Sequence, residues 1–132
     1  RSAFESLFNG TTKMIDKPGQ VFSRIHVDDI AGSILFLINL YFQGKNPLVV
    51  NVADNLPTNN LEVITFAAEI AKKSLPLTIP FEIAKNEMSP MALSFWQENR
   101  RVDNGLLCKK LGYSLIYPDY KSGLKNCFSK LK

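Results

Sequence analysis

Short apolar runs alternate with amphipathic stretches along this chain, which is the pattern of an α/β protein. The runs at residues 21–25 and 48–52 are rich in β-branched and aromatic side chains, and we expect strands there. The second run is almost continuously apolar, as in a parallel sheet that is covered on both faces. A shorter run at 77–81 contains Pro80 and follows Pro76, which favours the edge of a sheet.

Helical spacing and capping residues predict six helices. A polar connection is expected at residues 10–19, between the first helix and the first strand. The helix that ends near Phe42 is apolar on nearly every side, which is typical of a helix buried between layers. The expected starts are Ser2, Asp28 or Asp29, Asn59, Ser89, Asp103 and Asp119, and the expected ends lie near Gly10, Phe42, Lys73, Trp96, Gly112 and Leu131.

Composition narrows the class of protein. At 132 residues and 45% hydrophobic, the chain can bury one modest core. The net charge of +4 is not gathered into a basic stretch with interleaved aromatics, so we expect a solvated surface and no nucleic-acid partner. Cys108 and Cys127 each lie in an expected helix, which favours a reduced, cytoplasmic chain.

No membrane segment is expected either. The most apolar stretch, residues 34–42, is interrupted by Asn39 and is far shorter than the roughly 20 residues that cross a bilayer. No signal peptide opens the chain. Because the chain begins with Arg1 and not with Met, we expect a fragment of a longer protein, whether by design or by proteolysis.

The stretch Phe22-Ser23-Arg24-Ile25-His26-Val27-Asp28-Asp29-Ile30 is the most informative motif. It resembles the hydrophobic-His-Val-Asp-Asp-hydrophobic segment of extended and atypical short-chain dehydrogenases/reductases, which belongs to the carboxy-terminal half of those proteins. From Ser2 to about Lys125, further landmarks follow in an order similar to that half of NAD(P)-dependent epimerase/dehydratase-like proteins. They are Val50-Asn51-Val52-Ala53-Asp54, the helix from Leu61 to Lys73, Ser89-Pro90-Met91, and Arg101-Val102-Asp103-Asn104 before Leu111-Gly112.

The resemblance implies an α/β fold made of the carboxy-terminal portion of a Rossmann-like parallel sheet and a small mixed α/β substrate-binding lobe. Residues 1–75 would complete the Rossmann-like domain, and residues 76–132 would form the lobe and the terminal helices. In the family, the Gly-rich cofactor loop and the catalytic Tyr-x-x-x-Lys pair lie upstream of the His-Val-Asp-Asp segment, and neither is found upstream of His26 in this sequence. We therefore expect NAD or NADP in a full-length parent whose amino-terminal half is missing here, and neither cofactor nor catalysis in the fragment alone.

Arg24 is the strongest candidate for contact with a small anionic or nucleotide-linked substrate. It lies at the end of the expected strand at 21–25, the edge where α/β proteins bind ligands, and a guanidinium can hold phosphate or carboxylate bidentately. Many nucleotide-sugar epimerases and dehydratases have an Arg four residues before this His, where Phe22 stands here. A surface ion pair is the alternative role for Arg24.

Arg100 and Arg101 form a second cationic spot beside Trp96, which could wall a substrate pocket. The alternative places Trp96 in the core of the small lobe and leaves the arginines solvated. No Cys, His or carboxylate set has the spacing of metal ligands.

Structural roles are expected for the remaining motif residues. His26 is the single histidine, and no Ser or Cys nucleophile lies near it, so a hydrogen bond at the junction of strand and helix is favoured over catalysis. Asp28 and Asp29 are adjacent in a helix and point about 100° apart, so they do not share one site. Their negative charges suit a helix start.

Two classes of function remain open. In the first, the chain is the substrate-binding part of an epimerase/dehydratase-like oxidoreductase. In the second, it is a non-catalytic binding or interaction domain that keeps the fold. In either case an unpaired strand or an apolar face should be exposed, and self-association is expected.

Overall fold

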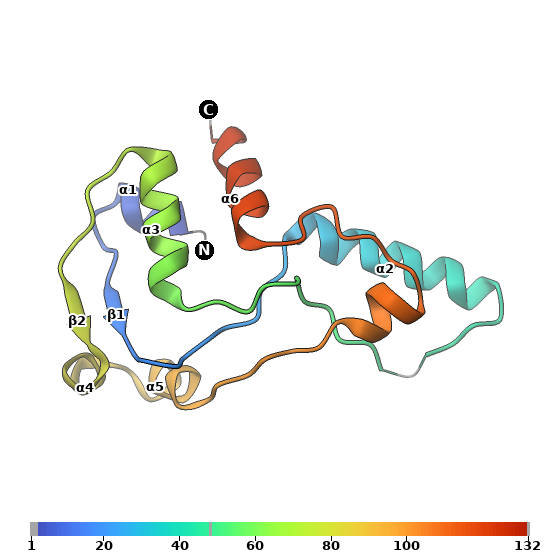
Figure 1. The fold of residues 1–132 in the computed structure, drawn as a ribbon, viewed down its shortest axis with the longest axis horizontal. Helices are drawn as coiled ribbons and strands as arrows, with labels where there is room; N and C mark the ends of the chain where they lie inside the picture. Colours follow the sequence, from blue (N-terminus) through green and yellow to red (C-terminus); the bar gives the residue numbers. More distant parts are fainter. Residues whose placement is uncertain (1–2, 48, 132) are drawn as a thin grey trace. The chain divides into compact units, whose positions relative to one another are not determined.

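The computed structural model describes residues 3–47 and 49–131, and Figure 1 shows their arrangement. The described residues form a mixed α/β fold with one small parallel sheet. By their contacts they divide into two compact units. The first holds residues up to 22, residues 58–100 and residues from 124 on, and the second holds residues 23–57 and 101–123. The elements in chain order are α1 (Ala3–Phe8), β1 (Met14–Asp16), α2 (Val27–Phe42), α3 (Asn60–Ala71), β2 (Thr78–Pro80), α4 (Phe81–Ala84), η1 (Lys85–Glu87), α5 (Pro90–Gln97), η2 (Leu106–Lys110) and α6 (Tyr120–Ser129).

The core of the first unit lies where α1 and β1 meet α3, which stand side by side in Figure 1. Phe4 is fully buried there, and its ring centroid lies 5.3 Å from that of Phe128 on α6. Apolar residues that recur every three to four positions, and so lie on one side of each helix, therefore form this core. The buried cluster consists of Phe4, Leu7, Met14, Ile64, Ala67 and Ala68, with Leu124, Cys127 and Phe128 packed against it.

Strands β1 and β2 pair in parallel, with Met14 beside Thr78 and Asp16 beside Pro80. The chain between them includes α3, which contacts β1, so the connection is a strand, helix and strand unit. Pro80 ends the pairing because it has no N–H to donate, and α4 begins at once.

Helix α3 begins as the sequence predicts. The Asn59 side chain accepts a hydrogen bond from the Glu62 N–H at 2.8 Å and donates to the Glu62 carboxylate at 2.8 Å. The first of these bonds satisfies the Glu62 N–H, which an uncapped helix start would leave without a partner, and the second joins the two side chains. The helix ends at Lys72, which has a φ of 52° in the left-handed region.

The second unit is organised around α2 and the segment that follows η2. Asp29 on α2 is fully buried and accepts hydrogen bonds from the backbone N–H groups of Ile116 at 2.7 Å and Tyr117 at 2.9 Å. Asn104 donates to the Ala53 carbonyl at 2.9 Å, and Leu107 on η2 is fully buried. Side-chain hydrogen bonds thus hold together three segments that form no sheet with one another in the described part of this unit.

The expected strand at 21–25 is wrong. Phe22 makes a single antiparallel bridge with Thr58, and residues 23–25 do not form a strand, although the Arg24 carbonyl accepts a hydrogen bond from the Asp54 N–H. A strand forms instead at β1, inside the expected polar connection, because Met14 packs in the buried cluster with Ile64 and Ala67 of α3, and Ile15 is buried as well. Apolar character alone does not make a strand, since the backbone also needs a neighbour to pair with.

The strand expected at 48–52 is absent over residues 49–52, and Leu48 lies outside the described residues. The expectation of a buried helix ending near Phe42 is also wrong. Helix α2 has the expected end, but its side chains Ile34, Leu35 and Phe42 are exposed. Both errors have one physical origin, because each expectation assumed neighbouring layers that the described residues do not supply.

Helices α1, α5 and α6 agree with the sequence pattern, whereas α4 and η1 were not expected, and the helix expected from Asp103 to Gly112 is only the short η2. The Ser89 side chain accepts from the Ala92 N–H at 3.2 Å with Pro90 in the first turn, and the Asp119 carboxylate accepts from the Ser122 N–H at 2.8 Å. Leu131, expected to face inward, is exposed. Ser2, the expected start of the first helix, lies outside the described residues. The division between residues 1–75 and 76–132 concerns roles in a longer protein and stays a prediction.

Candidate functional site

A small pocket of about 60 Å³ opens in the first unit, between the turn after β1 and the start of α3. Trp96 forms part of its wall, and Asp16 and Lys17 bring one charge of each sign to its rim. The volume is about that of two water molecules in the liquid, so only a small group enters it. The remaining lining residues are Ile15, Pro18, Gly19, Gln20, Asn59, Asn60 and Leu61.

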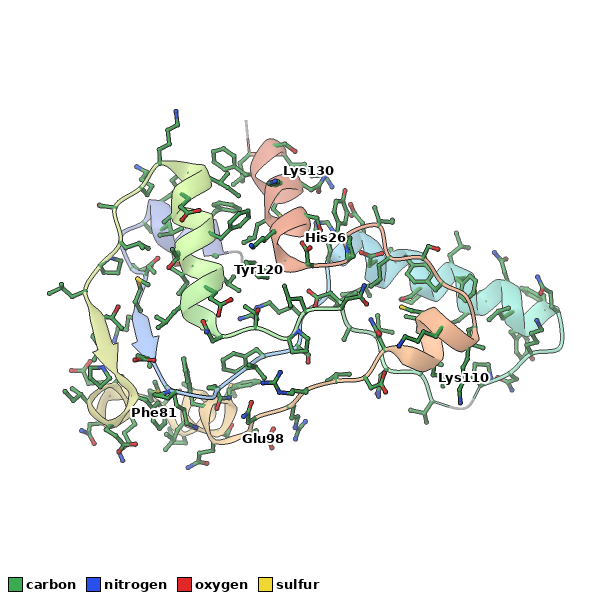
Figure 2. All side chains as sticks on the ribbon, viewed as in Figure 1. His26, Phe81, Glu98, Lys110, Tyr120 and Lys130 are labelled. Atoms are coloured by element: carbon green, nitrogen blue, oxygen red, sulfur yellow. The ribbon has the colours of Figure 1, made fainter. Side chains whose placement is uncertain are left out.

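Trp96 is held in this wall by two aromatic neighbours. Its ring stacks on Phe81 with centroids 5.8 Å apart, and the Phe22 ring meets it edge-on at 5.4 Å. Figure 2 labels Phe81 at α4. Lys17 also lies over the Phe81 ring, with its Nζ 4.7 Å from the ring centroid. The indole is therefore fixed by packing, as the wall of a binding site needs to be.

A set of hydrogen bonds, here called the 17–21/96–99 latch, joins the turn after β1 to the end of α5. Lys17 donates to the Trp96 carbonyl, and Gln20 donates to the Glu98 carbonyl. Asn99 donates to the Gly19 carbonyl at 2.8 Å and accepts from the Val21 N–H at 3.0 Å. Gln20 is buried, so its amide shapes the pocket floor and does not reach solvent.

The four residues expected to contact substrate are divided between the units. Trp96 and Arg100 belong to the first unit, whereas Arg24 and Arg101 belong to the second. Arg100 and Arg101 are exposed, and Arg100 forms a surface ion pair with Glu98 at 2.7 Å. Such a pair contributes about 0–1 kcal/mol to stability. The substrate contacts of all four residues stay predictions.

Arg24 is half-buried in the second unit beside Asp54. Burial lowers the pKa of the Arg24 guanidinium, while the negative charge of Asp54 and the Tyr120 phenol act in the opposite direction. An arginine remains charged at neutral pH despite such burial. The backbones are tied as well, because the Asp54 N–H donates to the Arg24 carbonyl at 2.6 Å.

Asp54 is the acidic residue whose charge acts on this cation. It is buried, and its Oδ1 accepts a hydrogen bond from the Leu56 N–H at 3.0 Å. Burial raises the pKa of Asp54, whereas the Leu56 N–H and the charge of Arg24 lower it. A half-buried guanidinium can still hold an anion through charge-assisted hydrogen bonds.

His26 and the two aspartates form the start of α2. The His26 Nδ1 accepts from the Asp28 N–H at 3.1 Å, and its ring centroid lies 4.1 Å from that of Tyr117. The Asp28 carboxylate oxygen Oδ2 lies 3.8 Å from the same nitrogen. Asp29 points away into the unit, where the Tyr113 hydroxyl donates to it at 3.0 Å. His26 and Asp28 thus lie at the start of α2, and the buried Asp29 carboxylate beside them accepts hydrogen bonds.

No known protein-family profile matches this chain, and no curated protein matches it either. Two solved structures do resemble it. One is a functionally unknown conserved protein from Silicibacter pomeroyi DSS, with 40% identity, a TM-score of 0.85, and a match over 98% of this chain and 44% of that one. The other is human epimerase family protein SDR39U1 (isoform 2) with NADPH, with 17% identity, a TM-score of 0.75, and a match over 93% of this chain and 40% of that one.

This chain shares its fold with part of an epimerase-family protein. The expected α/β fold class is therefore confirmed. The chain spans less than half the length of both matched structures. The human protein is only 17% identical to this chain, so this match supports a shared fold and nothing further.

The starts of α2, α3 and α5 do not fit the pyrophosphate of a dinucleotide. Such a group needs free N–H groups at a helix start that a Gly-rich turn leaves open. Here the starts of α2, α3 and α5 are closed by the side chains of His26, Asn59 and Ser89. Among the same residues no group of His, Cys, Asp or Glu could hold a metal ion, and no helix has the length and apolar content to cross a membrane.

Sequence reasoning missed Asp54, Gln20 and Tyr113. Asp54 follows an apolar run, and a charged residue at that point was a usable signal. Gln20 and Tyr113 gave no such signal, because their partners lie 78 and 84 positions away in the chain.

Proposed function

We propose that this chain is the substrate-binding part of a longer NAD(P)-dependent epimerase/dehydratase-like oxidoreductase. The observation that carries the proposal is the match of nearly the whole chain to less than half of two longer structures, one of them an epimerase family protein with NADPH. The sequence motif from Phe22 to Ile30 points to the same family. The remaining half of the longer protein would hold the cofactor phosphates and the catalytic Tyr and Lys.

Arg24 would contact an anionic group of the substrate. Its guanidinium feels the negative charge of buried Asp54, and it is half-buried, so an anion bound there would be partly shielded from water. Shielding strengthens a charge-assisted hydrogen bond relative to one on an open surface. Arg101, which precedes η2 in the same unit, would add positive charge.

Trp96 would offer an apolar surface to the substrate, since its ring is fixed by Phe81 and Phe22 and borders the pocket. Arg100 follows Trp96 in the same unit and would also contact the substrate. The pocket itself admits only a small group, so the body of a larger substrate would lie outside it. A cytoplasmic location remains part of the proposal.

The test is the reading frame upstream of the codon for Arg1 and the protein that it encodes. A Gly-rich loop after a strand and a later Tyr-x-x-x-Lys are expected there. Isothermal titration of the longer product with NADPH should show micromolar binding, and the 132-residue chain should show none. Micromolar binding by the short chain, or none by the long one, would overturn the proposal. A longer product that lacks both motifs would support a non-catalytic interaction domain instead.

A further inference from the structure

Two Asn-Gly pairs occur in the sequence, at residues 9–10 and 104–105, and the structure gives them different surroundings. Asn is a chemically labile residue, and it is most labile before Gly. The reason is that a Gly nitrogen without a neighbouring Cβ can reach the Asn side chain and close a cyclic imide. Whether the ring closes in a folded protein depends on how freely both residues move.

Asn9 and Gly10 form an exposed turn at the end of α1. The Asn9 side-chain amide makes no hydrogen bond with any residue that the structure describes. Gly10 has a φ of 66° and open space where a Cβ would stand. Its N–H donates to the Leu7 carbonyl at 3.4 Å, which is long for such a bond. Little therefore holds the Asn9 side chain away from the Gly10 nitrogen.

The second pair is held by both of its residues. The Asn104 side-chain amide donates to the Ala53 carbonyl at 2.9 Å and to the Asn55 side chain at 2.8 Å. The Gly105 N–H, which carries the nitrogen that would attack, donates to the Asp103 carboxylate at 2.6 Å. Ring closure at this pair must first break these hydrogen bonds.

We propose that Asn9 is a site of spontaneous deamidation and that the fold protects Asn104 from the same reaction. The Gly10 nitrogen attacks the carbonyl carbon of the Asn9 side chain. A C–N bond forms, and the side-chain amide leaves as ammonia together with the proton of the Gly10 N–H. Water then opens the imide at one of its two carbonyl carbons. One opening gives aspartate, and the other gives isoaspartate, in which the main chain runs through the former side chain.

The position of the turn gives this reaction a structural effect. Helix α1 supplies Phe4 and Leu7 to the core of the first unit, and the turn leads to β1. A new carboxylate at the end of α1 is disfavoured by the negative end of the helix dipole. Isoaspartate also adds a carbon to the main chain just before the N–H groups that donate back to α1. Neither substrate nor cofactor takes part, so this site is separate from the proposed enzyme function.

The test follows both pairs in one sample of the 132-residue chain, kept folded at mildly alkaline pH. Trypsin releases the pairs in separate peptides, residues 2–13 and 102–109, each with a single Asn. Mass spectrometry measures the conversion of amide to acid, and enzymatic carboxyl methylation detects isoaspartate. Asn9 should convert at least roughly tenfold faster, because the hydrogen bonds of Asn104 must open first. Equal rates, faster conversion at Asn104 or no conversion at Asn9 would overturn the proposal.

Two controls separate the fold from the dipeptide. In concentrated urea both pairs should convert at similar rates, since their local sequence chemistry is the same. A difference that persists in urea would show that the fold does not protect Asn104. Asn55→Ala removes one Asn104 bond and should speed conversion there several-fold in the folded chain, with no change at Asn9 in the other unit. An unchanged rate at Asn104 would contradict protection by these bonds.

Thermal unfolding tests the structural effect. The aged chain, separated from fresh chain by ion exchange, should unfold at a lower temperature than the fresh chain does. Asn9→Gln is the matched variant, because Gln keeps the amide but must close a larger ring and reacts far more slowly. Its midpoint should stay constant over the same period. Equal midpoints for fresh and aged chain, or an equal fall in Asn9→Gln, would contradict a loosening of α1 by deamidation at Asn9.

Discussion

The carboxylate of Asp29 accepts a hydrogen bond from the hydroxyl of Tyr113 at 3.0 Å, although the two residues are 84 positions apart. The same carboxylate accepts the backbone N–H groups of Ile116 and Tyr117. A buried carboxylate with three donors is well satisfied, and each donor would lack a partner without it. Asp29 therefore holds the segment after η2 against α2.

Replacing Asp29 with Asn should destabilise the chain by about 1–3 kcal/mol, because an amide keeps one acceptor oxygen and brings an NH2 group toward backbone donors. The midpoint of urea denaturation measures this. Asp28→Asn is the control, since Asp28 is partly exposed and should change stability by less than about 1 kcal/mol. An equal loss of stability in the two variants would contradict the role of Asp29 in holding the segment after η2 against α2.

Gly32 allows Tyr113 to approach α2. A Cβ at this position would collide with the Tyr113 hydroxyl and lie 3.3 Å from the ring carbon that bears it. Gly32→Ala should therefore cost about 1–3 kcal/mol despite the better helix propensity of Ala. In a Tyr113→Phe background the same change should cost clearly less. A double-mutant cycle by chemical denaturation measures the coupling, and additive effects would rule out the contact.

The Tyr113 phenol should lose its proton at a higher pH than an ordinary tyrosine does. Burial, followed by the hydrogen bond to Asp29 and the charge of Asp29, raises the pKa of Tyr113 from 10.0 to about 12. The folded state then holds the proton more tightly than the unfolded state, so this stabilisation is present below pH 10 and is lost as the pH rises toward 12. Absorbance at 295 nm should show a last phenol step near pH 12 that Tyr113→Phe removes. The same final step in the variant would contradict the assignment.

Asn59 should be the residue at the start of α3 that matters most for its stability. Asn59→Ala removes both hydrogen bonds to Glu62 and should cost about 1 kcal/mol. Asn60→Ala is the neighbouring control and should lie within about 0.5 kcal/mol of the unmodified chain. Thermal unfolding followed by circular dichroism measures both.

Arg24 should act on substrate binding in the longer protein. Arg24→Lys keeps the charge but loses the planar fork, and the substrate KM should rise. Arg24→Ala should lose about 1.5–3 kcal/mol of binding, the range of a charge-assisted hydrogen bond. The affinity for NADPH should barely change, and Lys125→Ala, at another exposed cation, should alter neither constant. Unchanged KM and kcat in Arg24→Ala would return Arg24 to an ion-pair role with Asp54.

Local signals in the sequence were sufficient for the longer helices but not for α4 and η1. Asn59 with Glu62, and Ser89 with Pro90, mark helix starts because the capping partners lie within three residues. The strands could not be predicted in this way. The run at 21–25 is as apolar as β1, and what separates them is the distant partner Thr78 beside Met14. The site shows the same limit, since Arg24 stood out in the sequence but its neighbour Asp54 lies 30 positions later.

The 17–21/96–99 latch has a consequence for the order of folding. Its bonds join positions 78 to 80 residues apart, and closing a flexible loop of that length costs about 4 kcal/mol of chain entropy. Once Met14 pairs with Thr78, most of that loop is already closed, and only the short stretch from β2 to α5 remains to be ordered. The latch therefore forms after the two strands have met, and the wall of the Trp96 pocket is completed late in the folding of its unit.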